Sequence, residues 1–244
     1  MNRTFRSARQ LAASPLAFGA VLLAYGNGSA WLFARRSGET PVRFNWAHMA
    51  MLGLTLAWSA AERTSAHELG LERGRATKSL AYGMGAGALG SLGVGVVTSV
   101  PVISRSLAVP EIAALPRSGV ARLLLGQFLL GSALFEEMAF RGLLQAKLAR
   151  TLGPIRALIV TSGAFALWHG LIVWHNCCRL GVPRNWLPMV HGSVLGTLFV
   201  SGVGLGLLRH WTGHLAAPIA AHWIVLVAIV ARLRVPQKKT NAPR

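Results

Sequence analysis

Long apolar segments most constrain how this chain can fold. Seven follow one another, at residues 11–33, 46–61, 80–103, 119–140, 158–174, 188–208 and 215–233. Most of them approach the ~20 residues that an α-helix needs to cross the hydrocarbon core of a bilayer. Because lipid offers no partners to backbone polar groups, only helices and closed barrels span it. The sequence therefore predicts an all-α fold, a polytopic transmembrane helical bundle.

The charge of the chain fits a membrane protein better than a nucleic-acid-binding protein. Hydrophobic residues make up 53% of the chain, charged residues only 13%, and the formal net charge is +18. In a soluble protein this charge would favour nucleic acid, but here lysine and arginine mostly flank the apolar segments. We expect them to contact lipid headgroups, and we expect no nucleic-acid partner.

The number of spans follows less directly from the sequence. Arg3, Arg6 and Arg9 precede the first apolar segment, and the chain ends in a basic tail. Both basic ends favour the cytoplasmic side, which an odd number of spans forbids. We therefore expect about six to eight spans with an even total. Gly28-Ser29-Ala30 loosely resembles a signal-peptide cleavage site, but the apolar character resumes beyond it, so we expect the first helix to be retained.

Three regions are predicted within one integrated membrane domain. Residues 1–117 hold the N-terminal helices and connecting loops, residues 118–231 form the membrane core, and residues 232–244 form the basic tail. Multi-pass insertion in the cell membrane of a bacterium is the expected location.

Two adjacent carboxylates, Glu136 and Glu137, lie near the end of the fourth apolar segment. They are two of only seven acidic residues, all of them glutamates. Ionisable groups inside a membrane are costly and are retained mainly where they are paired or used. Glu137 and Arg141 are spaced i and i+4, which predicts an ion pair on one helix face. Glu136 is then the freer carboxylate and the candidate general base.

Histidines on later apolar segments could complete a site. Phe165 and His169 are spaced i and i+4, so that ring and imidazole share a helix face, and His222 lies on the last segment. Three helices would thus bring acid–base groups together in apolar surroundings. His191 is a weaker, supporting candidate, and His48 is expected at the membrane interface. A structural role for the same groups, as polar contacts between helices, stays open.

Two familiar protease chemistries lack their residues. No G-x-S-x-G sequence occurs and the chain contains no aspartate, which disfavours a serine hydrolase. No H-E-x-x-H sequence occurs either.

The motif series resembles that of the CPBP family of intramembrane proteases, which includes the Rce1-type CAAX prenyl endopeptidases and bacterial proteins linked to bacteriocin processing or self-immunity. The series consists of Glu136-Glu137-x-x-x-Arg141, Phe165-x-x-x-His169, Gly202-x-x-x-Gly206, Thr212-Gly213-x-Leu215 and Pro218 leading to His222. It covers about residues 120–230.

The resemblance implies that Glu136, with His169, activates water for attack on an amide. It also implies that Glu137 and Arg141 support that carboxylate and that His222 stabilises the oxyanion. The family is described both as metal-free and as metal-dependent. The sequence therefore leaves open a glutamate base without cofactor or a divalent metal such as zinc bound by Glu136, His169 and His222. One departure stands out, because Leu226 occupies a position where the family commonly has asparagine.

An intramembrane endopeptidase acting on a membrane-associated or lipidated peptide is the leading hypothesis. A missing oxyanion donor typically lowers turnover by ~10²–10³, so Leu226 motivates a non-catalytic alternative, a binding or self-immunity protein of the same family. Buried glutamate and histidine would also fit a proton-coupled transporter, although the sequence has no internal repeat.

Overall fold

The computed structural model describes residues 14–35, 46–99 and 110–234, and this part of the chain is helical with connecting turns and no strand. Its elements are α2 (Pro15–Arg35), α3 (Trp46–Ala61), α4 (Ala66–Leu69), α5 (Ala76–Ser99), α7 (Pro110–Ala113), α8 (Arg117–Ala121), η1 (Arg122–Leu134), α9 (Phe135–Glu137), η2 (Met138–Leu144), α10 (Gln145–Leu152), α11 (Pro154–Trp168), α12 (Gly170–Arg179), α13 (Leu187–Thr212) and α14 (Ala216–Leu233). The predicted all-α bundle is confirmed. Arg3, Arg6 and Arg9 and the tail beyond residue 234 lie outside the described residues.

Five helical segments are long and apolar enough to cross a membrane, at residues 76–96, 117–152, 154–179, 187–212 and 216–233. Two other predicted segments are helical but do not meet the length and hydropathy expected of a membrane-spanning helix. α3 has only 16 residues, and the apolar run of α2 is interrupted by Tyr25-Gly-Asn-Gly-Ser29. The chain is thus an integral membrane protein with five such helices among the described residues, fewer than the expected six to eight.

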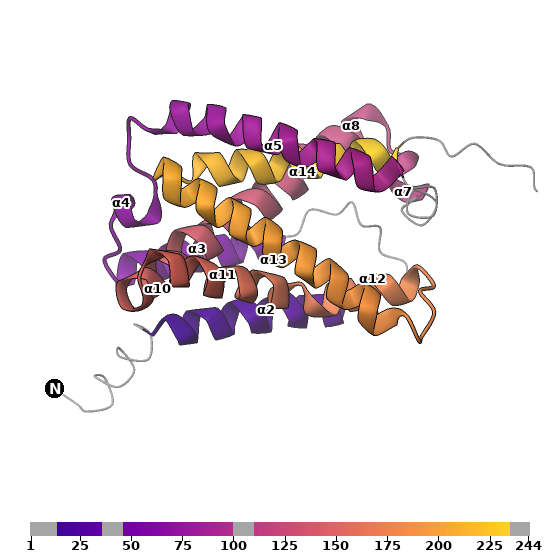
Figure 1. Cartoon of the computed structure of the whole chain (residues 1–244), viewed down its shortest axis with the longest axis horizontal. Coiled ribbons are helices and arrows are strands. Elements are labelled where there is room, and N and C mark those ends of the chain that lie inside the picture. The colour runs from indigo at the N-terminus through magenta and orange to yellow at the C-terminus, as the bar shows by residue number, and fades with distance from the viewer. Residues whose placement is uncertain (1–13, 36–45, 100–109, 235–244) are drawn as a thin grey trace, which may run out of the picture.

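Two groups of helices enclose the centre of the bundle (Figure 1). α5 lies alongside α14 on one side, and α2 lies along α11 and α12 on the other. The α5–α14 contact depends on glycine: a Cβ at Gly83 would collide with the backbone of Ala217, and one at Gly87 would lie 3.1 Å from the Cα of Ala221. The close approach predicted for this glycine-rich segment is therefore present.

The segment that carries the two glutamates is not a regular α-helix. η1 and η2 are π-helical, and only the short α9 between them is α-helical. π-helical geometry is rare and frequently occurs at functional sites. Phe135, Phe140 and Leu143 on this segment are fully buried and pack against Phe18 and Leu22 of α2. This core contact fixes the segment at the centre of the bundle.

The segment predicted as one span at residues 158–174 is broken at His169. α11 ends at Trp168, α12 begins at Gly170, and His169 between them has φ −86° and ψ 0°. The predicted span is therefore present within the helical segment at residues 154–179, with a break at His169 that was not predicted.

Candidate functional site

Glu136, Glu137 and Arg141 form a buried charged cluster. Their exposed fractions are 3%, 0% and 2%. Side chains of this kind are almost never so deeply buried unless they are paired. Their contacts therefore decide what each can do.

The predicted Glu137–Arg141 ion pair is present. Nη1 of Arg141 lies 3.2 Å from Oε1 of Glu137, and its Nη2 donates a hydrogen bond of 3.4 Å to the backbone carbonyl of Gly202 on α13. The guanidinium also lies 4.2 Å from the centre of the Phe165 ring. Arg141 thus connects η2, α11 and α13, and a carbonyl, a carboxylate and a ring face surround its charge.

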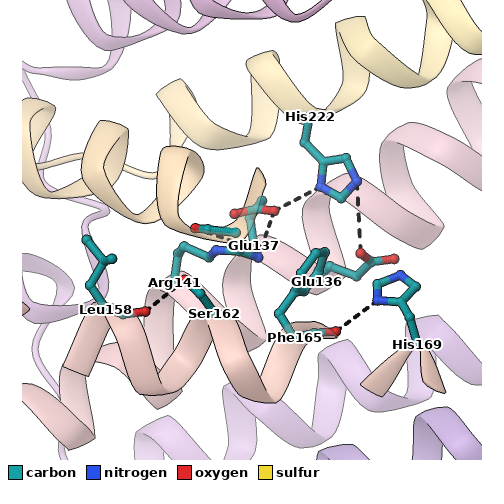
Figure 2. A network of polar contacts seen from close by, with 9 residues as sticks. Glu136, Glu137, Arg141, Leu158, Ser162, Phe165, His169 and His222 are labelled. Atoms are coloured by element: carbon teal, nitrogen blue, oxygen red, sulfur yellow. Dashed lines mark hydrogen bonds and ion pairs between the residues drawn. The ribbon is translucent and has the colours of Figure 1, made fainter. Parts of the chain in front are cut away.

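His222 bridges the two carboxylates (Figure 2). Its Nδ1 lies 2.9 Å from Oε1 of Glu137, and its Nε2 lies 3.9 Å from Oε2 of Glu136. An ionised carboxylate only accepts hydrogen bonds, so Nδ1 carries the hydrogen and donates it to Glu137. The remaining ring nitrogen, Nε2, is the one that faces Glu136.

His169 is oriented by the break in its own helix. Its Nδ1 lies 2.9 Å from the carbonyl oxygen of Phe165. A carbonyl can only accept, so Nδ1 donates and Nε2 of the neutral ring is left as an acceptor. The Phe165 ring packs against the His169 ring at 4.7 Å and against the His222 ring at 6.3 Å.

Figure 2 shows the Glu136 carboxylate between the rings of His222 and His169. Both Glu136 and His222 are close enough to His169 to interact with it electrostatically. Oε2 of Glu136 is buried and has no hydrogen-bond partner among the described residues. A buried carboxylate oxygen left in this way requires an explanation, and a bound water or substrate group is one.

Two residues singled out from the sequence lie beside this cluster rather than in it. Nε2 of His191 contacts the carbonyl oxygen of Gly170 at 3.0 Å, so His191 meets the backbone next to His169. Leu226 is half-buried on α14, one turn beyond His222.

His48 is the histidine that the sequence placed wrongly. We expected it at the membrane interface, but only 9% of it is exposed, and its ring stacks on Phe135 at 5.3 Å. It is also close enough to Glu136 and His169 to interact electrostatically with both. The spacing of polar residues along α3 could have predicted this burial. His48, Thr55 and Ser59 lie with Met51 on one face of the helix, and all four are buried.

The metal alternative requires Glu136, His169 and His222 to gather around one ion. The donor types fit zinc in kind, since glutamate and histidine are common ligands. As placed, no group of three or more histidine, cysteine or acidic side chains among the described residues could bind a metal ion. As placed, Glu136, His169 and His222 therefore do not form a binding site for a metal ion.

Comparison with known proteins identifies the region that carries the site. The model of a family described as Type II CAAX prenyl endopeptidase Rce1-like matches residues 118–228. The match includes the Glu136–Arg141 motif, His169 and His222. No curated protein and no solved structure gives a significant match. The resemblance drawn from the motifs is thereby confirmed.

Proposed function

We propose that this chain, whose residues 118–228 match the model of the Rce1-like endopeptidase family, hydrolyses a peptide bond within the membrane. One observation carries the proposal: Glu136 is buried and faces His222 at 3.9 Å, whereas Glu137 is already bound to Arg141 and His222. Oε2 of each carboxylate is buried without a hydrogen-bond partner among the described residues, but Glu137 is held through its Oε1 by Arg141 and His222, whereas Oε2 of Glu136 faces the histidines and is the oxygen placed for a reacting water.

The proposed reaction begins with water held between Glu136 and His169. Glu136 takes a proton from this water, and the resulting hydroxide oxygen forms a bond to the amide carbon while the carbonyl π pair moves onto oxygen. When the C–N bond breaks, the protonated Glu136 gives its proton to the departing amine. Nε2 of His169 accepts the second water hydrogen and orients the attacking lone pair.

His222 is the proposed donor to the developing oxyanion. Its Nδ1–H is committed to Glu137, so only Nε2 can donate, and it does so when the ring is protonated. Arg141 and Glu137 hold this ring in place from the opposite side. Leu226 offers no hydrogen bond one turn further along, so the substrate oxygen would have one side-chain donor where the family commonly supplies two.

No step of this reaction passes through a metal. The Nδ1–H groups of His169 and His222 are donated to protein oxygens, which leaves the Nε2 atoms for the water and the substrate, and no three histidine, cysteine or acidic side chains gather as a metal-binding group among the described residues.

The expected substrate is a membrane-associated or lipidated protein or peptide, and the expected surroundings are the lipids of a bacterial cell membrane. The burial of Glu136 supports the substrate class, since this residue is only 3% exposed and lies in a helical segment of membrane-spanning length. A soluble peptide would have to leave water to reach it. The basic residues that flank the apolar segments support contact with anionic headgroups.

The test is Glu136→Gln in protein reconstituted into liposomes with a lipidated reporter peptide. Removing a general base lowers turnover by ~10²–10⁴, and we expect a loss in that range. Glu72→Gln is the matched control, because the Glu72 side chain is 45% exposed and pairs only with His67 and Arg75 among the contacts described. Unchanged cleavage by Glu136→Gln with normal folding would refute the proposal.

Leu226 favours a second candidate, a non-catalytic binding or self-immunity protein that retains the charged cluster for structure. This candidate predicts that Glu136→Gln and His169→Ala leave the cellular phenotype intact. Loss of the phenotype in either variant at normal expression would rule it out.

A further inference from the structure

Asn27 of α2 connects the N-terminal helix to the break at His169. Its Nδ2 donates a hydrogen bond of 3.1 Å to the carbonyl oxygen of Leu167, and its Oδ1 accepts one of 2.9 Å from the backbone N–H of Leu171. The same Nδ2 also donates to the carbonyl oxygen of Leu23, one turn back on α2. One side chain thus contacts the backbone on both sides of His169, from a helix outside the family match at residues 118–228.

The break creates the need for these bonds. The backbone N–H of His169 bonds to the carbonyl of Ala166 instead of continuing the i to i−4 pattern of α11. Helix ends leave carbonyl and N–H groups without partners, and in a membrane such groups cost several kcal/mol each. Asn27 carries one donor group and one acceptor, which match one group on each side of the break.

The surrounding packing is shaped for this contact. Gly26 lies directly against the indole ring of Trp168, where no Cβ fits, and a Cβ at Gly170 would lie 3.3 Å from Oδ1 of Asn27. On its other side, Gly170 receives the contact from His191 through its carbonyl oxygen at 3.0 Å. Small residues therefore let α2 reach the break, and two polar side chains hold it.

We infer that Asn27 is a positioning residue for His169, and that α2 is therefore part of the catalytic site. The inference rests on the proposed function, in which Nε2 of His169 acts beside Glu136. The bond from Nδ1 of His169 to Phe165 depends on where the chain turns at the break, and Asn27 fixes that turn. It follows that α2 stays attached, because cleavage after Ala30 would separate Asn27 from the chain that it positions.

The test compares Asn27→Ala with Ser29→Ala in full-length reconstituted protein. Ser29 lies on the same helix, and among the described residues its hydroxyl bonds within α2, to the carbonyl of Gly26 at 3.0 Å. Misplacing a catalytic group by about 1 Å can cost ~10²-fold in rate, so we expect kcat of Asn27→Ala to fall at least ~10-fold with KM nearly unchanged. The pH dependence of kcat should also shift, because the surroundings of the His169 ring change. Ser29→Ala should leave all three quantities as in the wild type.

Hydrogen exchange of the segment from Leu167 to Val173 tests the contact without relying on activity. In Asn27→Ala the amide of Leu171 loses its acceptor and should exchange faster, whereas Ser29→Ala should leave its rate unchanged. If wild-type protein shows this protection but cleaves nothing, the proposed function fails while the contact stands. Unchanged kcat and pH profile in Asn27→Ala beside an active wild type would overturn the inference. Asn27→Ser, which is polar but too short to bridge the break, decides the same question if Asn27→Ala does not fold.

Discussion

Arg141→Met removes the positive charge of the buried cluster while keeping an unbranched side chain of similar reach. Arg141 is 2% exposed, and the change takes away its 3.2 Å contact with Glu137, its bond to the Gly202 carbonyl and its contact with the Phe165 ring. Breaking a buried ion pair from one side typically costs 3–5 kcal/mol, because the other charge is left without compensation. We expect the free energy of unfolding to fall by about that amount.

Unfolding with increasing sodium dodecyl sulfate in mixed micelles, followed by circular dichroism, measures this loss. Arg150→Met is the matched control, since Arg150 pairs with Glu68 at 2.8 Å but its side chain is 44% exposed. Exposed pairs are worth about 0–1 kcal/mol. Adding Glu137→Gln to Arg141→Met should recover part of the loss, with a coupling free energy of about 2–3 kcal/mol. If Arg141→Met lowers the free energy of unfolding no more than Arg150→Met does, then Arg141 does not stabilise the buried charge of Glu137.

Three further predictions concern other parts of the chain. Leu226→Asn should raise kcat about tenfold or more in the liposome cleavage assay by supplying an oxyanion donor, and unchanged kcat would show that no second donor is missing at that position. Gly206→Ala should lower the free energy of unfolding by about 1–3 kcal/mol, because its Cβ would lie 2.8 Å from a leucine side chain of α11, whereas Gly204→Ala, with open space around it, should not. Hydrogen bonding from Ser65 lowers the pKa of Glu68 below its ordinary value of 4.5. The ionised Glu68 carboxylate therefore contributes to the free energy of unfolding above pH 4.5, and this contribution is lost as the pH falls through the lowered pKa. Glu68→Gln, which can keep the helix-capping bonds, should reduce the loss of unfolding free energy measured below pH 4.5.

Periodicity and composition account for what the sequence predicted well. The apolar segments are helices because their length and composition leave few alternatives in lipid. The pairing of Glu137 with Arg141 follows from spacing on one helix, which is a local property. The glycines of α5 predicted that another helix would approach closely, but they did not indicate that this helix is α14.

The features that the sequence did not reveal depend on contacts between helices. His169 lies in an apolar run without proline, so nothing local marks the break, which Asn27 stabilises from a helix more than a hundred residues away. His48 resembled an interfacial residue because its helix is short, but its stripe of buried polar residues faces the centre of the bundle. The π-helical segments around the glutamates likewise have no clear signature in sequence.

The division of roles between Glu136 and Glu137 therefore rests on partners more than on helix geometry. Glu137 contacts both Arg141 and His222, so its charge is compensated whatever the state of the histidine. Glu136 has only Nε2 of His222 within ion-pair distance among the contacts described. When that ring is neutral, Nε2 turns a lone pair toward the carboxylate, and only a proton or a water between them makes the contact favourable. When the ring is protonated, the same contact becomes attractive. The geometry that presents water to Glu136 therefore depends on His222 as well, and the base is a pair of side chains and not one residue alone.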